Sequence, residues 1–415
     1  MWSKQEWAVF LLFFVFAIVF TQTRVDTNDG SRMNAVQSMV EQGTLRIDNS
    51  SFLWTSDKVR INDHWYSDKP PISYLVAVPI YFVLYHGGLT FAHHASFAYG
   101  ITTLLTVGLI TSIMFVYFFR FLKRYKLTDR QRWLYTFALG FGTQLLPFRL
   151  VYNNHAMGAA LLFFSYYLWL AVKKPEQFFW SGLLAGFTAA IDLVTGGIFL
   201  VLFTVTHYRR HGYAKTAKYA LGACIFPILG WLINYWLSGS FAYFSVQPAL
   251  WNYPGTLFNP SNLAGVVLQS PAVALRYAGP MLIGWTHGVL TFNPLLAFGI
   301  LGVLVALFTK NKYRTEAVVI TIGVVSVFLY YFFRTSNYGG CGWGFRYTVP
   351  LIPLVFVFIP FLLTRKSRWT PLLATLFWPV MLASVTIAGF GMFQPWACHP
   401  LIIIKNVSAQ LVASF

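Results

Sequence analysis

Residues 8–22 read AVFLLFFVFAIVFTQ, an almost unbroken apolar run near the start of the chain. A membrane-spanning helix needs roughly 20 mostly apolar residues, and shorter ones are tolerated inside a bundle. Lys4 precedes the run and no small-residue cleavage site follows it, so we predict a retained helix, not a signal peptide. Ten further runs share this character: about 95–118, 133–148, 155–172, 178–191, 193–207, 219–237, 289–308, 315–333, 348–363 and 370–390. The chain is therefore predicted to be an all-α polytopic membrane protein with about eleven transmembrane helices.

The composition of the whole chain supports this class. Of 415 residues, 57% are hydrophobic and 10% are charged, whereas a soluble domain carries about 25% charged residues. With a mean hydropathy of +0.59, the chain has too little polar surface to cover a soluble globule. Three cysteines are too few to staple a chain of this length. Disorder, a coiled coil and a secreted disulfide scaffold are excluded.

The charges predict how the chain is oriented. Net charge is +18, and basic cytoplasmic loops explain such an excess in a membrane protein without a nucleic-acid partner. About two thirds of the basic residues fall on the cytoplasmic side if residues 71–85 form a juxtamembrane helix that does not cross. This threading places the N-terminus in the cytoplasm. We expect one transmembrane domain over residues 1–415, with a first extracytoplasmic loop at 23–94 and a second, interfacial segment at 238–288.

The first extracytoplasmic loop holds seven of the twelve acidic residues. Among them, Asp29 follows the first predicted span and precedes a short helix expected from Ser31 to Glu41. Aspartate is a good N-cap, because the helix N-terminus stabilises its charge. Capping is therefore one interpretation of Asp29, and a catalytic carboxylate beside a membrane-facing site is the other.

The run Asp68-Lys69-Pro70-Pro71 is more specific. Two prolines fix an extended approach and then start a helix. Lys69 is thereby held at the lipid headgroup level, where its ammonium can bind a phosphate. A lysine that snorkels to anchor the juxtamembrane helix is the alternative.

A glycine-rich loop precedes the tenth predicted span and carries Arg334 and Arg346. Glycine lets the backbone approach a ligand closely, and the arginine fork matches phosphate oxygens. An interfacial belt of aromatic and arginine side chains is the alternative.

Other polar groups lie at predicted span ends. Asp192 falls at an external hairpin tip, either as a functional group or as a polar plug between helices. His155 opens a span beside the candidate site, and no histidine pair has a convincing metal spacing. A divalent cation between an acid and a histidine is allowed but has no support in the sequence. Cys341 and Cys398 share the outer side, so a disulfide is permitted but not required.

Taken together, these residues resemble the GT-C superfamily of membrane glycosyltransferases. The resemblance is closest to the bacterial members of the protein O-mannosyltransferase and lipid A aminoarabinose transferase branch. That branch has an Asp-Glu motif after the first span, with an aromatic residue three positions after the glutamate. Residues 29–33, DGSRM, keep the first acid but lack the second acid and the aromatic residue. Gly43, the run 67–71 (SDKPP) and the glycine-rich element 339–350 match further motifs, although Asp68 directly precedes Lys69.

The resemblance implies a single GT-C-like domain that takes a polyprenyl-phosphate-linked sugar from the outer leaflet of a bacterial cytoplasmic membrane. The acceptor would be a glycan, a lipid or a protein, and membrane lipid is a further partner. Asp29 would be the general base of an inverting transfer on the extracytoplasmic face. No cofactor is required, and the missing second acid weakens the case for a metal. The leaving phosphate would be bound by Lys69, Arg346, Arg334 and Arg149, and substrate by Asp26, Asp68, Tyr66, His155, Tyr347 and Asp192.

Two other classes of function remain. A transporter or flippase for a lipid-linked sugar or polymer predicts inverted repeats and charges on both sides of the midplane, and the sequence displays neither. A structural subunit of an envelope assembly predicts that Asp29 and Lys69 are freely replaceable.

Overall fold

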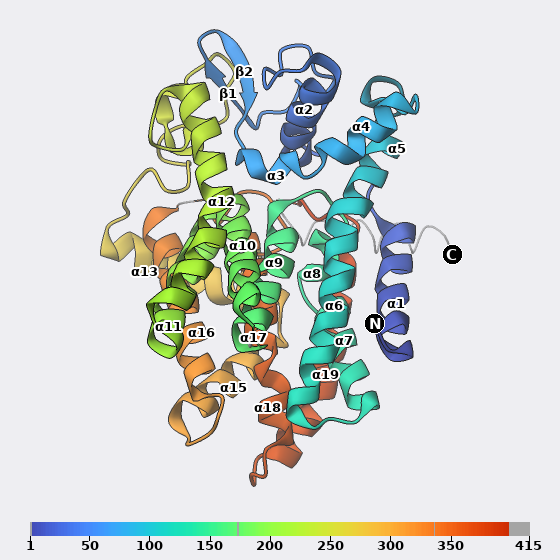
Figure 1. Cartoon of the computed structure of the whole chain (residues 1–415), viewed down its shortest axis with the longest axis vertical. Coiled ribbons are helices and arrows are strands. Elements are labelled where there is room, and N and C mark those ends of the chain that lie inside the picture. Colours follow the sequence, from blue (N-terminus) through green and yellow to red (C-terminus); the bar gives the residue numbers. More distant parts are fainter. Residues whose placement is uncertain (1, 172–173, 336, 398–415) are drawn as a thin grey trace.

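The computed structural model describes residues 2–171, 174–335 and 337–397. Its helices form a bundle that is elongated along one axis, and a smaller group of elements lies across one end (Figure 1). The bundle helices are α1 (Lys4–Phe20), α5 (Phe91–Thr103), α6 (Leu109–Phe121), α7 (Asp129–Phe141), α8 (Leu145–Phe148), α9 (Asn154–Ala171), α10 (Pro175–Ile191), α11 (Leu193–His211), α12 (Tyr213–Ser238), α13 (Pro271–Ile283), α14 (Val289–Phe292), α15 (Leu296–Phe308), α16 (Arg314–Arg334), α17 (Ile352–Phe356), α18 (Phe358–Thr364) and α19 (Thr370–Gly391).

Each of the eleven predicted apolar runs coincides with a helix or a series of helices. By length and composition, five helices in the described residues could cross a membrane: Phe91–Tyr125, Tyr213–Ser238, Arg314–Arg334, Arg346–Thr364 and Thr370–Gly391. Two shorter apolar helices are Pro71–His86 and Leu296–Phe308. The helical class is therefore confirmed, while the number of eleven spans stays a prediction.

Apolar side chains both fill the bundle and cover its outside. In the interior, the rings of Phe13 and Phe115 stack with centroids 4.1 Å apart. On the outside, Trp236 of α12 is 75% exposed and Leu382 of α19 is 68% exposed. Such an exposed apolar surface suits contact with lipid better than contact with water.

Glycine allows the closest helix packing in the bundle. Gly182 and Gly186 of α10 lie against the backbone of Tyr219 and Ala223 in α12, and Gly222 of α12 lies against the backbone of α10. A methyl group at any of these glycines would collide with the facing helix. Small residues of this kind let helix backbones approach closely within a membrane.

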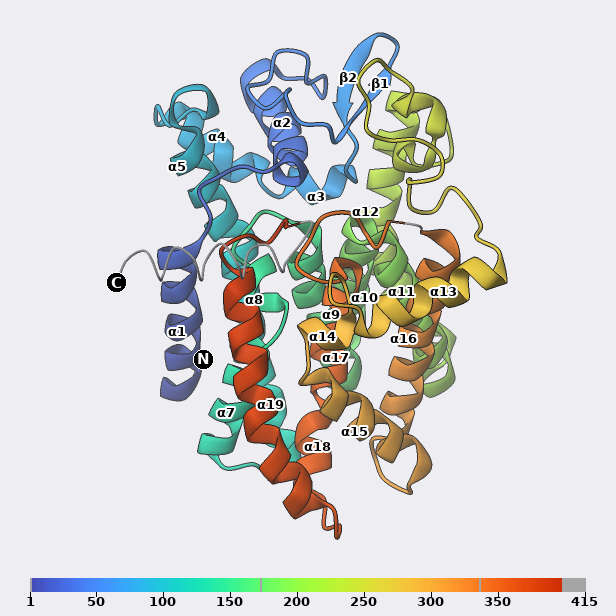
Figure 2. The ribbon, with the colours of Figure 1, turned by 180° about the vertical axis from the view of Figure 1, so that it is seen from behind.

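The elements across the end of the bundle come mainly from the first predicted loop. They are α2 (Thr27–Gln42), β1 (Lys58–Ile61), β2 (His64–Ser67), α3 (Pro71–Leu75) and α4 (Val78–His86). Figure 1 shows α3 and α4 crossing the end of the bundle beside α2. On the opposite face, α19 runs over α7 and α8 and ends just below this outer layer (Figure 2).

The strands β1 and β2 form an antiparallel hairpin that the all-α prediction does not include. Val59 pairs with Tyr66 in its register. Asn62 and Asp63 make its turn with φ of 48° and 64°, the positive values that a tight hairpin turn requires.

The second predicted segment packs on this hairpin. Its described part contains the short 3-10 helices Phe244–Val246 and Pro248–Trp251, followed by irregular chain and α13. A small apolar cluster joins the two regions and consists of Val59, Ile61, Tyr66, Phe244, Trp251 and Leu263. The hairpin is therefore fixed from the side that faces away from α2.

Candidate active site

The site begins at the N-terminus of α2. Asp26 is the N-cap, and its Oδ1 accepts a hydrogen bond of 2.7 Å from the backbone N–H of Thr27. The helix starts at Thr27, four residues before the predicted Ser31, because Asp26 caps it. The interpretation of Asp29 as the cap is therefore wrong, and its carboxylate is available for another role.

Asp29 lies in the first turn of α2 and is fully buried. The hydroxyl of Tyr99 on α5 donates to Oδ2 of Asp29 at 2.7 Å. The indole N–H of Trp396 donates to the same carboxylate, 3.1 Å from each oxygen. Burial raises the pKa of Asp29 to about 7, although both donors and the nearby Arg32 charge oppose the rise.

A second cluster surrounds Lys69. Its Nζ donates to Oδ2 of Asp57 at 2.6 Å and to Oδ2 of Asp68 at 2.7 Å. Ser31 of α2 donates to Oδ1 of Asp68 at 2.7 Å, and its Oγ lies 2.8 Å from the Ser67 hydroxyl. The lysine of the predicted Pro-Pro motif is therefore held between two carboxylates.

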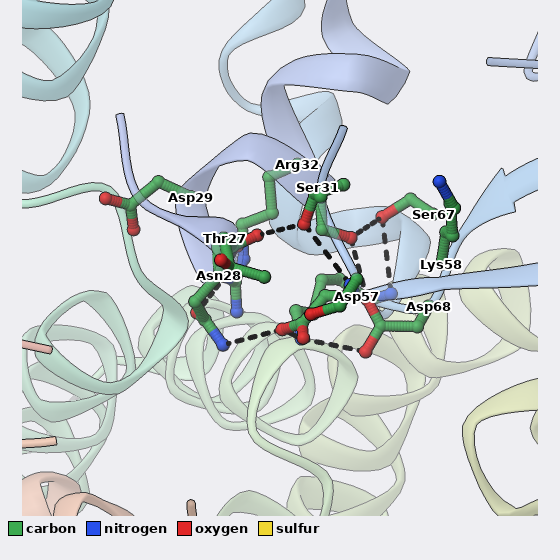
Figure 3. A network of polar contacts seen from close by, with 12 residues as sticks. Thr27, Asn28, Asp29, Ser31, Arg32, Asp57, Lys58, Ser67 and Asp68 are labelled. Carbon is green, nitrogen blue, oxygen red and sulfur yellow. Dashed lines mark hydrogen bonds and ion pairs between the residues drawn. The ribbon is translucent and has the colours of Figure 1, made fainter. Parts of the chain in front are cut away.

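The pKa values of the two carboxylates are shifted in opposite directions. Burial acts to raise the pKa of Asp57. The charge of Lys69 and its hydrogen bond outweigh this effect of burial and hold the pKa of Asp57 below its ordinary value. Burial raises the pKa of Asp68, despite the same lysine. Figure 3 shows that Asp29 points away from this cluster, although all three acids are close to the start of α2.

Arg32 connects the cluster to the bundle. Its Nη1 donates to the carbonyl of Asn28 at 2.9 Å and to Oδ1 of the same residue at 2.6 Å. Asn28 in turn donates to Asp57 at 3.3 Å, and Nη2 of Arg32 donates to Oδ1 of Asn154 at the start of α9. Arg32 is almost fully buried, and its charge acts on Asp29 without a direct hydrogen bond.

The network ends at a histidine and an aspartate that the sequence analysis selected separately. Nδ1 of His155 lies 2.8 Å from Oδ2 of Asp192, and both side chains are buried. Asn154 donates to the same oxygen at 3.4 Å. Hydrogen bonds thus run from Lys69 to Asp192. They pass through Asp57, Asn28, Arg32 and Asn154.

Arg346 lies beside this network. Its guanidinium is over the rings of Tyr347 and Trp396, 5.6 and 5.2 Å from their centroids. Nη1 donates to the carbonyl of Cys341 at 3.3 Å. Unlike Lys69, Arg346 forms no ion pair with an acidic side chain among the described residues. Its charge nevertheless acts on Asp57 and on Asp26, whose pKa is raised by burial.

The glycine-rich loop gives Arg346 its position. Gly339, Gly340 and Gly344 have φ of 85°, 72° and 74°, a region that other residues rarely adopt. A Cβ on Gly344 would lie 2.5 Å from Nε2 of Gln144. The glycines predicted to allow close backbone approach are therefore required by the turn and by packing.

Three predicted residues lie apart from these contacts. Arg149 is fully buried inside the bundle, where its guanidinium is ringed by Phe13, Phe16, Phe115 and Phe141. Tyr66 belongs to the apolar cluster of the hairpin. The backbone carbonyl of Arg334 accepts a hydrogen bond of 2.7 Å from the backbone N–H of Gly265. Among the described residues, no hydrogen bond joins the Arg334 side chain to Lys69. Tyr347, by contrast, stacks on Tyr331 at 4.5 Å and lies next to His155.

Several residues that contact the site were not predicted from the sequence. Arg32 follows Asp29 by three positions on a helix, a spacing that places two side chains next to each other on the helix surface. That spacing could have identified it. Tyr99 and Trp396 are separated from Asp29 by 70 and 367 residues, and no local pattern marks them.

Metal ligands do not gather here. No group of three or more His, Cys, Asp or Glu side chains in the described residues could hold a metal ion. Cys341 is disulfide-bonded, and Cys398 lies outside the described residues.

No protein-family model and no curated protein matches the sequence. Among solved structures, the fold is similar to the crystal structure of ArnT from Cupriavidus metallidurans bound to undecaprenyl phosphate. The TM-score is 0.57 and the sequence identity is 16%, with 90% of this chain and 63% of that chain covered. This chain thus spans less than two thirds of the length of ArnT. At this identity the likeness is one of fold alone, and it agrees with the fold expected from the sequence.

Proposed function

We propose that this chain is a glycosyltransferase that moves a sugar from a polyprenyl-phosphate-linked donor to an acceptor, with Asp29 as general base. The observation that carries the proposal is a buried carboxylate with a pKa of about 7 beside Arg32, close to a network that holds Lys69. The undecaprenyl phosphate in the ArnT structure supports the same class of lipid carrier here.

Asp29 suits the role of base at neutral pH. A general base works best when its pKa lies near the operating pH. In the proposed reaction its carboxylate takes the proton of an acceptor hydroxyl, and that oxygen forms a bond to the anomeric carbon. The bond from this carbon to the phosphate oxygen breaks, and its electron pair leaves with the lipid phosphate. One displacement inverts the anomeric centre.

The leaving phosphate needs cations, not a proton donor. Arg346 is our first choice, because its guanidinium has no acidic partner among the described residues and arginine binds phosphate through a two-pronged fork. Lys69 has one remaining N–H beyond the two that Asp57 and Asp68 accept, so it would act as a secondary contact. Arg334 is our third choice for a cation that binds the leaving phosphate. Arg149 is omitted, since phenylalanine rings surround it.

The sugar would occupy the region next to Arg346. The pair His155 and Asp192 offers a fixed imidazole there, and the adjacent Tyr347 offers an aromatic face and a hydroxyl. Asp26 and Asp68 lie on the α2 side of the same region. We place this site on the extracytoplasmic face of a bacterial cytoplasmic membrane, with the N-terminus in the cytoplasm. The acceptor class, a glycan, a lipid or a protein, stays open.

The test uses purified protein in detergent with a panel of short-chain polyprenyl-phosphate sugars and measures release of the free lipid phosphate. Asp29→Asn is expected to bind the donor but to release no lipid phosphate. The matched control is Asp63→Asn, because Asp63 is an exposed aspartate at the hairpin turn whose one ion pair within the described part of the chain is with Arg60. Equal release by wild type and Asp29→Asn would remove Asp29 from the chemistry.

A further inference from the structure

The base of the proposed reaction is closed off in this structure. Asp29 has no exposed surface. Its oxygens already accept hydrogen bonds from Tyr99 and Trp396. An acceptor hydroxyl must replace one of these donors before Asp29 can take its proton. Tyr99 is the fixed donor, because it lies on α5 and its hydroxyl also accepts from the backbone N–H of Tyr152.

Trp396 is the other donor. It belongs to residues 392–397, which follow α19 and which we name the C-terminal strap. Two backbone hydrogen bonds tie the strap to the glycine-rich loop, from Gly342 to Ala397 at 3.1 Å and from Trp343 to Pro395 at 2.8 Å. The strap therefore shares its position with the loop that carries Arg346.

Trp396 contacts both functional groups at once. Its indole N–H points to Asp29, while its ring lies under the guanidinium of Arg346 at 5.2 Å. A guanidinium binds a phosphate through charge-assisted hydrogen bonds, which are stronger than its attraction to an aromatic face. A phosphate at Arg346 thus competes with the contact that seats the tryptophan over the carboxylate.

We propose that Trp396 is a positioning residue that couples binding of the donor phosphate to exposure of Asp29. Phosphate binding draws Arg346 from the indole ring, the Trp396 N–H leaves Asp29, and the acceptor hydroxyl takes the vacated place. Tyr99 keeps its hydrogen bond to the carboxylate, and water or the acceptor hydroxyl takes the place of the indole N–H, so the buried charge is not left unpaired. When no lipid-linked sugar is bound, the C-terminal strap shields the Asp29 carboxylate from water. This inference rests on the proposed function, which supplies the identity of the anion that Arg346 binds.

The test measures how fast a water-soluble carbodiimide and an amine modify Asp29, read from its peptide by mass spectrometry. The probe is a short polyprenyl phosphate without sugar, so no turnover occurs. In wild type, Asp29 is expected to be protected alone and modified faster with the lipid. This arm needs no variant, so it is independent of any folding defect. An equal rate with bound lipid and without it would overturn the coupling.

Variants separate the two contacts of the tryptophan. Trp396→Phe keeps a ring but lacks the N–H, and we expect Asp29 to be modified about tenfold faster without lipid, since a hydrogen bond to a charged group is worth at least that factor. The matched control is Trp343→Phe. Trp343 is a buried tryptophan in the glycine-rich loop whose Nε1 has no partner among the described residues, and loss of its indole N–H should leave Asp29 protected. A protected Asp29 in Trp396→Phe would also overturn the coupling.

The outcomes distinguish this inference from the proposed function. Lipid binding is measured separately by native mass spectrometry. If the lipid binds but the rate of Asp29 modification stays unchanged, the coupling is wrong while the proposed function stands. Failure of wild type to bind any polyprenyl phosphate would remove the donor class and the coupling with it. Arg346→Gln lacks the contact that seats Trp396, so its Asp29 should be modified faster than in wild type without lipid, and the lipid should cause no further change.

Discussion

Replacing Asp29 with asparagine should stabilise the protein while it abolishes turnover. The pKa of this buried carboxyl rises from 3.8 to about 7 on folding, which corresponds to a cost of about 4 kcal/mol once the group is fully ionised. Asparagine keeps the shape of the side chain without the charge, so it avoids that cost. Its carbonyl can accept from Trp396, and its amide can donate to the Tyr99 hydroxyl.

The pH dependence identifies the cause. Below about pH 4 the carboxyl is protonated in both folded and unfolded chains, and ionisation costs nothing. Between about pH 4 and 7 the unfolded chain loses the proton and the folded chain keeps it, so wild-type stability falls as pH rises. Above about pH 7 the full cost is present. The stability difference between Asp29→Asn and wild type should therefore grow by about 4 kcal/mol from pH 4 to 7 and then level off.

Thermal unfolding in detergent from pH 4 to 8 measures this difference as a widening gap of several degrees in Tm. Asp63→Asn supplies the baseline, because Asp63 is 91% exposed and carries no buried charge. A gap between Asp29→Asn and wild type that stays constant from pH 4 to 8 would refute the reasoning, since the carboxyl would then ionise equally in both states.

Three further predictions concern turnover, stability and lipid binding. Lipid-phosphate release should rise with pH and level off above about 7, because only ionised Asp29 accepts a proton; a rate that is flat from pH 5 to 8 would contradict this role. Lys69→Met leaves its two buried carboxylate partners without a cation and should cost about 3–5 kcal/mol, seen as a lower Tm than in Lys69→Arg; an unchanged Tm would count against the buried pairing. Arg346→Lys should weaken binding of a short polyprenyl phosphate about tenfold, because lysine lacks the two-pronged guanidinium contact with phosphate. Arg149→Lys should leave this affinity unchanged. A larger loss of affinity in Arg149→Lys than in Arg346→Lys would exchange the roles of the two arginines.

Local sequence predicted the parts of the protein that depend on neighbouring residues. The apolar runs predicted the helices, because burying about 20 apolar residues in lipid needs no distant partner. The two prolines after Lys69 start α3 as expected. Glycines 339, 340 and 344 adopt positive φ in the loop before Arg346, as their clustering indicated.

Contacts between segments that are distant in the sequence could not be predicted from local patterns. Asp57 meets Lys69 only because an unpredicted hairpin folds the intervening residues back. Trp396 reaches Asp29 because α19 ends beside the outer layer. Arg149 was assigned to the phosphate as a further cation beside Lys69 and Arg346, but its guanidinium lies inside the bundle, among phenylalanine rings.

The central claim is a single displacement at the anomeric carbon, driven by one carboxylate base. The anomeric configuration of the product, determined by NMR against that of the lipid-linked donor, tests it most directly. The account predicts inversion, with no glycosyl-enzyme adduct at any time. A product that retains the configuration of the donor would contradict it, because retention requires two displacements and a nucleophile that attacks the sugar itself.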